Sequence, residues 1–318
     1  MANNNSLTGG ELLLRSVNYR LILVQVFVAL FLCINVLLIR TFFMKDFFYT
    51  TMRYILFAVT LMSDCLILIL TNFLLIFNYF HLTMQMWLCL IFCILSSVYT
   101  FVTPVTLTAM TLERYVAICM PLRHGELCST RSALRCILII HSLSCVPCFV
   151  ILSIFFASAT HSFYTQSRVC SVEIFIFHTW QAHIRSAISQ FYFLIMCIAI
   201  VSSYVKIMKV AKAASGENKK STKKGLRTVL LHGFQLLLCL IQLWCPFIEA
   251  AVLQINLMLF INVRYFNYIT FILAPRCLSP LIYGIRDEKF FLALKYYALC
   301  GLAVDVLLIH LVCVVYCS

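Results

Sequence analysis

The chain has 318 residues, of which 63% are hydrophobic and 11% are charged, and its mean hydropathy is +1.00. A soluble domain carries charge on about a quarter of its residues, so this composition predicts a chain that faces lipid. It leaves no soluble module that could bind nucleic acid. The formal net charge of +13 is informative through its distribution along the chain.

Seven apolar runs are long enough to cross a bilayer, since a span needs about 20 mostly apolar residues. They lie near 21–43, 54–80, 86–118, 135–159, 186–211, 226–253 and 265–285. The predicted fold is therefore all-α, a polytopic membrane protein whose seven-transmembrane helix bundle occupies residues 21–285. Residues 1–20 are polar and show no cleavable signal peptide, so we expect them to form an extracellular N-terminus. Asn4 begins a glycosylation sequon there.

Apolar side chains after the seventh run fall on one helical face. They are Phe290, Phe291, Leu294 and Tyr297, and they follow the charged residues 286–289. This pattern predicts a short amphipathic helix on the inner membrane surface within residues 286–300. Cys300 is a palmitoylation candidate. Residues 301–318 form an apolar tail of unclear role, interrupted by Asp305 and His310.

The third run ends in the charged block Glu113, Arg114 and Tyr115. If that end is cytoplasmic, 18 of the 24 basic residues lie inside and five lie outside, in agreement with the positive-inside rule. Basic loops that meet anionic lipid explain most of these charges, so membrane lipids are expected partners. We predict a multi-pass plasma-membrane protein with its N-terminus outside and the end of its seventh span in the cytoplasm.

The charged block is also a candidate switch. Glu113 and Arg114 can pair at rest, and helix movement that breaks the pair would free Arg114 for an intracellular partner. The alternative is a simple anchor, in which the arginine reaches toward lipid head groups.

Two prolines mark candidate hinges. Pro246 follows Trp244 in the sixth run, and because proline removes a backbone hydrogen bond it bends the helix. A ligand that contacts Trp244 would then move the cytoplasmic half of the sixth helix outward. The alternative is that the proline forms only a static kink. Pro280 softens the inner end of the seventh run, so Tyr283, like Tyr204 in the fifth run, can swing inward and hold an open state.

Charged side chains also occur inside the spans. Asp64 and Arg276 both lie about 10–15 Å from the inner face at helical rise. Because intramembrane ions usually pair, we predict an Asp64–Arg276 ion pair with Asn35 as a polar neighbour. The alternative is that Arg276 reaches separately to the interface. Glu249 either lines a cavity or lies protonated against a neighbouring helix.

Two cysteines are disulfide candidates, because only Cys89 and Cys170 of the seventeen fall at predicted outer positions. Cys89 precedes Arg114 by 25 residues, or about 38 Å of helix, which places the two residues at opposite faces of the bilayer. A bond to Cys170 in the long outer loop would cover a cavity, and the oxidising compartment favours it. Two unpaired thiols are the alternative.

These landmarks together resemble the rhodopsin-like (class A) G-protein-coupled receptors, and within them the odorant receptors, especially the fish-type ones. Residues 110–119, Met-Thr-Leu-Glu-Arg-Tyr-Val-Ala-Ile-Cys, followed by Pro121-Leu122-Arg123-His124, are similar to the family segment MAYDRYVAIC with PLRY or PLHY. Residues 279–286, Ser-Pro-Leu-Ile-Tyr-Gly-Ile-Arg, are similar to the ending NPxIYSLR.

The resemblance implies a role for each matched residue. Cys89 and Cys170 match the family disulfide, Glu113 to Tyr115 the switch that engages a heterotrimeric G protein, Trp244 and Pro246 the toggle and kink, Pro280 and Tyr283 the NPxxY element, and Asn35 and Asp64 the polar residues of the first two helices. Two departures matter. Ser279 replaces the motif asparagine, and Arg276 lies where the wider class has a small polar residue beside its sodium-binding aspartate. We therefore expect no sensitivity to sodium.

A ligand cavity between the third, fifth, sixth and seventh helices would be mainly apolar or hydroxylated, which suits a small, weakly polar odorant. Helical phase selects Ser96, Ser97, Thr100, Phe101, Tyr192, Phe247, Ile248, Ala251 and Ile269 as its lining. The alternative is that these residues only pack the bundle.

Other classes of membrane protein fit less well. A transporter or channel would need repeats or broken helices, and the sequence shows neither. The histidines are scattered, so we expect no enzyme, cofactor or metal. A non-olfactory class A receptor for a lipid or peptide is the serious alternative.

Overall fold

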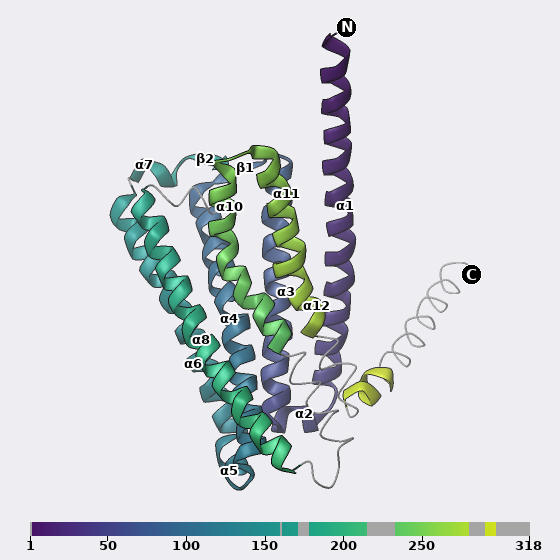
Figure 1. Cartoon of the computed structure of the whole chain (residues 1–318), viewed down its shortest axis with the longest axis vertical. Helices are drawn as coiled ribbons and strands as arrows, with labels where there is room; N and C mark the ends of the chain where they lie inside the picture. The colour runs from purple at the N-terminus through teal and green to yellow at the C-terminus, as the bar shows by residue number, and fades with distance from the viewer. Residues whose placement is uncertain (1, 160, 171–177, 215–232, 280–289, 297–318) are drawn as a thin grey trace, which may run out of the picture.

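The computed structural model describes residues 2–159, 161–170, 178–214, 233–279 and 290–296 (Figure 1). Within these ranges seven helices are long and apolar enough to cross a membrane. They are Asn18–Phe43, Met52–Tyr79, Met86–Cys119, Thr130–Ser158, Trp180–Val210, Gly233–Leu253 and Leu257–Ser279. The predicted seven-helix architecture is confirmed.

The element order follows these spans, with short helices and two strands between them. The elements are α1 (Ala2–Phe43), α2 (Asp46–Thr50), α3 (Met52–Tyr79), β1 (Thr83–Gln85), α4 (Met86–Cys119), α5 (Pro121–Leu127), α6 (Thr130–Ser158), α7 (His161–Tyr164), β2 (Ser167–Val169), α8 (Thr179–Ala214), α10 (Cys245–Leu253), α11 (Leu257–Asn267) and α12 (Ala274–Ser279). Residues 233–241 and 290–296 are also helical.

The seventh span begins eight residues earlier than predicted, at Leu257. Asn256 caps it, since its side chain accepts a hydrogen bond from the Met258 backbone N–H at 2.7 Å, and a capping asparagine is a strong helix start. The predicted start at residue 265 overlooked this cap. The predicted inner end, residues 280–285, lies outside the described residues.

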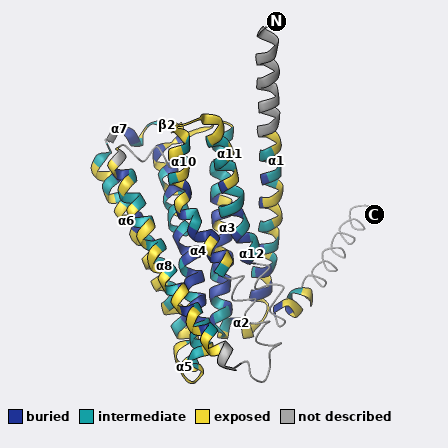
Figure 2. Cartoon of the chain, viewed as in Figure 1, coloured by how far each residue is buried: buried dark blue, intermediate teal, exposed yellow. Residues whose placement is uncertain are grey.

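Helix α4 lies at the centre of the bundle and packs against α3, α6 and α8. The buried residues concentrate where these helices meet, while the outward faces of α6 and α8 are exposed (Figure 2). Those outward faces carry large apolar side chains such as Leu138, Phe149 and Ile198. An apolar surface of this kind is the arrangement expected of a lipid-facing bundle.

The end of the bundle that the sequence predicts to lie outside the cell, called the outer end from here on, is covered by the loop that follows α6. Its strand β2 pairs antiparallel with β1, and Met84 lies opposite Arg168. The two strands lie at the end of the bundle opposite α5 (Figure 1). Cys170, directly after β2, is thereby brought to the first turn of α4.

The opposite end of the bundle, called the inner end from here on, is closed by an aromatic cluster. Phe290, at the start of the short helix after the seventh span, is fully buried. Its ring centroid lies 5.1 Å from that of Phe48 and 5.5 Å from that of Phe57. The predicted amphipathic helix therefore packs on α2 and α3 through Phe290, and Ala293 is buried in the same core, whereas Phe291 is 40% exposed.

Replacement of Phe290 by alanine should lower the thermal stability of the purified protein. Removal of a buried phenylalanine costs about 3–5 kcal/mol. The Phe291→Ala variant is the matched control and should change stability far less. Thermal unfolding in detergent measures both, and equal stability of the two variants would contradict this packing role.

Candidate functional site

The structure brings Asp64 and Arg276 together in the middle of the bundle. The Arg276 Nε lies 3.9 Å from the Asp64 Oδ1, and the two side chains are 1% and 0% exposed. Asp64 comes from α3 and Arg276 from α12. Each charge needs the other at this depth, because an isolated buried ion is strongly unfavourable.

Hydrogen bonds extend this pair to the third and sixth spans. The Ser279 hydroxyl donates to the Asp64 Oδ2 at 2.9 Å, and the Thr103 hydroxyl donates to the Oδ1 at 3.4 Å. Gln235 of the sixth span donates in turn to the Ser279 hydroxyl at 2.6 Å and to the Pro275 carbonyl at 3.1 Å. Ser279, in place of the motif asparagine, therefore links Gln235 to Asp64.

The guanidinium of Arg276 also donates a hydrogen bond to a backbone carbonyl that a proline leaves without its helical donor. Pro275 has no N–H, so the carbonyl of Phe271, four residues earlier, lacks its helical donor. The Arg276 Nη1 donates to that carbonyl at 3.1 Å, to the carbonyl of Ile272 at 2.5 Å and to the Gln242 Oε1 at 3.0 Å. Residues 268–273 form a π-helical turn at this point. Arg276 thus stabilises an irregular seventh helix and connects it to the sixth.

Sequence reasoning missed Gln235, Gln242 and Thr103. The two glutamines are seven residues apart, so they lie on one face of the sixth helix, and each interrupts an apolar run. That spacing was the available signal. Asn35 is fully buried, but its amide makes no hydrogen bond within the described part of the chain. The expected polar neighbour is therefore not hydrogen-bonded to Asp64.

The sixth span is irregular at the predicted hinge. It changes from α-helix to a 3-10 turn at Gln242–Trp244, and Pro246 lies in the first turn of α10. The Trp244 ring lies 6.0 Å from that of Phe193 on α8, edge to face, and Trp244 is 39% exposed. Glu249, above the hinge, accepts a hydrogen bond from Asn267 of the seventh span at 2.9 Å.

At the inner end, Glu113 is buried and its Oε1 lies 3.3 Å from the His124 Nε2 on α5. His124 was not singled out from the sequence. Burial raises the pKa of the Cys128 thiol above its ordinary value, and nearby Glu113 and Cys136 raise it further. Arg114 is half-buried, and its ion pair with Glu113 stays a prediction.

Two tyrosines of the predicted switch, Tyr115 and Tyr204, contact neighbouring helices. The Lys206 Nζ lies 5.3 Å from the centroid of the Tyr115 ring. The Tyr204 ring lies so close to Gly233 that a Cβ at that glycine would meet it at 3.1 Å. Both contacts join α8 to the inner ends of other spans. Pro280, Tyr283, Cys300 and the tail 301–318 lie outside the described residues, as does the side chain of Asn4.

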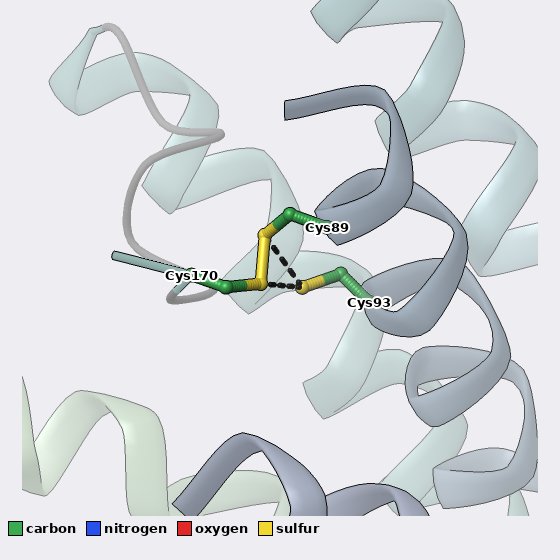
Figure 3. Close-up of side chains that lie close together, drawn as sticks. All are labelled: Cys89, Cys93 and Cys170. Carbon is green, nitrogen blue, oxygen red and sulfur yellow. Dashed lines mark hydrogen bonds between the residues drawn. A yellow bond between two sulfur atoms is a disulfide. The ribbon is translucent and has the colours of Figure 1, made fainter. Parts of the chain in front are cut away.

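The structure contains a disulfide between Cys89 and Cys170, with Cα atoms 5.6 Å apart. Figure 3 shows this bond joining α4 to the outer loop, with Cys93 beside it. The Cys93 sulfur lies 4.0 Å from each disulfide sulfur. The outer loop is thus fixed over the top of the third span.

The predicted ligand residues lie on α4, α8, α10 and the seventh span, and the structure places two aromatic members of the set in direct contact. The rings of Phe101 and Tyr192 are 5.3 Å apart, edge to face. The Tyr192 hydroxyl donates to the Leu143 carbonyl at 2.7 Å, and the Thr100 hydroxyl to the Ser96 carbonyl at 2.7 Å. Ser97, Phe247 and Ile269 are partly buried, and Ile248 and Ala251 are exposed.

Seven spans, an outer disulfide and a buried ion pair characterise this membrane protein. The family described as 7 transmembrane receptor (rhodopsin family) matches residues 21–283. The chain belongs to this family, and it is accordingly a multi-pass membrane protein and not an enzyme.

Comparison with individual proteins shows which members of this family the chain resembles. Odorant receptor 131-2 of Danio rerio is 43% identical over 303 residues, which cover 95% of this chain and 93% of the relative. Growth hormone secretagogue receptor type 1 of Homo sapiens is 25% identical over 64% of this chain and 59% of its own length. Galanin receptor 2a of Danio rerio is 25% identical over 58% of this chain and 51% of its own length.

Removing either partner of the central ion pair should destabilise the protein strongly. Asp64→Asn or Arg276→Gln leaves one buried charge uncompensated, which costs about 3–5 kcal/mol. The double variant should lose less than the sum of the two single losses, as expected for coupled residues. Thermal unfolding of the wild type, the two single variants and the double variant measures this coupling. Arg135→Gln, at an exposed arginine, is the control. Additive losses would contradict the pair.

Sodium should not stabilise the wild-type protein, because the Arg276 guanidinium already provides the cation beside Asp64. Exchanging sodium for choline at constant ionic strength should therefore leave the unfolding temperature unchanged. Arg276→Gln should acquire a dependence on sodium, since Asp64 then lacks its cation. A sodium effect in the wild type that is lost in Asp64→Asn would contradict this expectation.

Proposed function

We propose that this chain is an odorant receptor. It binds a small, weakly polar molecule within the helix bundle and activates a heterotrimeric G protein through movement of the sixth helix. The observation that carries the proposal is the 43% identity to Odorant receptor 131-2 over 95% of the chain. Membership of the rhodopsin family supports the coupling to a G protein.

The orientation that we propose places the N-terminus outside the cell and the α5 end in the cytoplasm, at the plasma membrane. The Cys89–Cys170 disulfide supports this orientation, because disulfides persist in oxidising compartments. The basic residues of the opposite end support it as well. Both arguments favour an exterior position for the β1–β2 end.

The proposed ligand site lies between α4, α8 and α10. The Phe101–Tyr192 contact supplies an aromatic surface, and the Tyr192 hydroxyl is already bonded to the fourth span. The acid of the sixth span, Glu249, is hydrogen-bonded to Asn267. These features favour an uncharged ligand over an amine.

The proposed activation step begins at the hinge around Trp244 and Pro246. Outward movement of the inner half of the sixth helix would strain the hydrogen bonds of Gln235 and Gln242 to the seventh. It would also separate Gly233 from Tyr204. These contacts supply a resting state that ligand binding can overcome, as a two-state switch requires, and Arg114 then becomes available to the G protein.

Arg114→Ala should strongly reduce signalling without loss of surface expression. In cells that express the chain with a cAMP reporter, an odorant panel should raise cAMP for the wild type and for Arg135→Ala, in which an exposed cytoplasmic arginine is removed. Arg114→Ala should lower the response more than about tenfold, the equivalent of about 1.4 kcal/mol. Equal responses from equally expressed Arg114→Ala and Arg135→Ala would contradict the switch.

The same assay tests the ligand class. The panel includes small volatile molecules, lipids and peptides. Response to a lipid or peptide alone, with no response to volatile molecules, would replace the odorant proposal by that of a non-olfactory class A receptor.

A further inference from the structure

Three side chains of the types that bind metal ions in proteins lie close together at the inner end of the third span. Glu113 comes from α4, His124 from α5, and Cys128 caps the C-terminus of α5. One ligand atom from each lies within 4.8 Å of the other two. The three residues are separated by ten and three positions in the sequence, so the turn between α4 and α5 creates the cluster.

The distance between the oxygen and nitrogen ligands matches the coordination sphere of zinc. Two N or O ligands at about 2.0–2.1 Å from a tetrahedral zinc ion lie about 3.3 Å apart. The observed distance between the Glu113 Oε1 and the His124 Nε2 is 3.3 Å. The Cys128 backbone N–H donates to the His124 carbonyl at 2.9 Å, so these two residues are one helical turn apart. Ligands at i and i+4 on one helical face are a common zinc arrangement.

The chemistry of the ligands favours zinc over other divalent cations. Imidazole, thiolate and carboxylate are its usual ligands, whereas calcium and magnesium prefer oxygen alone. Glu113 is 7% exposed, and a buried carboxylate needs a compensating cation. A carboxylate and a thiolate together would neutralise the two charges of the metal ion.

We propose that Glu113, His124 and Cys128 bind a zinc ion, with water as the fourth ligand. As the zinc–sulfur bond forms, the Cys128 thiol releases its proton to solvent, and no redox change occurs. Bound zinc holds α5 against α4. It also occupies the Glu113 carboxylate of the predicted switch, so zinc regulates signalling; this second part rests on the proposed function, whereas binding does not.

Cobalt is the spectroscopic probe for the site. Full-length protein in nanodiscs, with the Cys89–Cys170 disulfide intact, should bind one equivalent of Co²⁺ with a thiolate-to-cobalt absorption band, and Zn²⁺ should displace it. His124→Ala and Cys128→Ser should weaken binding more than about tenfold, since loss of even an outer-shell partner costs about 10–100-fold. Cys136→Ser removes a neighbouring thiol outside the cluster and should bind as the wild type does.

A measurement on the wild type alone guards against misfolded variants. Zn²⁺ should protect Cys128 from alkylation, measured by mass spectrometry, and should leave Cys136 reactive. Absence of the cobalt band, equal binding by wild type and Cys128→Ser, or alkylation of Cys128 that zinc does not slow would each overturn the site and leave only a His124–Glu113 hydrogen bond.

A signalling assay tests the regulatory part of the proposal separately from zinc binding. With purified G protein, zinc should raise agonist-stimulated nucleotide exchange of the wild type but not of His124→Ala, because a Glu113 carboxylate that binds zinc no longer holds Arg114. If zinc binds and exchange is unaffected, the regulatory part fails and the site stands. If no agonist stimulates exchange, the proposed function fails, and the cobalt result still decides the site.

Discussion

The buried ion pair between Asp64 and Arg276 constrains the middle of the bundle. Neither charge is exposed to solvent, so the helices that carry them must bring them together or lose stability. Thr103 and Ser279 complete the hydrogen bonding of the carboxylate. Four spans are thereby fixed relative to one another by a single polar centre.

This centre also reaches the helix that the proposed mechanism moves. Gln235 and Gln242 connect the sixth span to the seventh, one through Ser279 and the other through Arg276. The cation is part of the chain, so it cannot dissociate as a bound ion can. The charge of Asp64 is therefore balanced by a side chain of the protein itself and needs no ion from the medium.

The two ends of the bundle are held by different interactions. At the outer end a covalent bond and a pair of short strands fix the loop over α4. At the inner end the contacts are aromatic and polar: Phe290 packs on α2 and α3, and Glu113 meets His124. Non-covalent contacts can be exchanged during switching, which suits the end where a G protein would bind.

The sequence by itself determined the number of spans, and it predicted the Cys89–Cys170 disulfide and the pairing of Asp64 with Arg276. These follow from hydropathy, spacing and the high free energy of an isolated ion in lipid. Tertiary structure alone decided that Gln235 and Gln242 bond to the seventh helix, that Arg276 satisfies the carbonyl freed by Pro275, and that His124 meets Glu113. Those contacts depend on how the helices are rotated and where their turns place side chains, and local sequence patterns do not specify either.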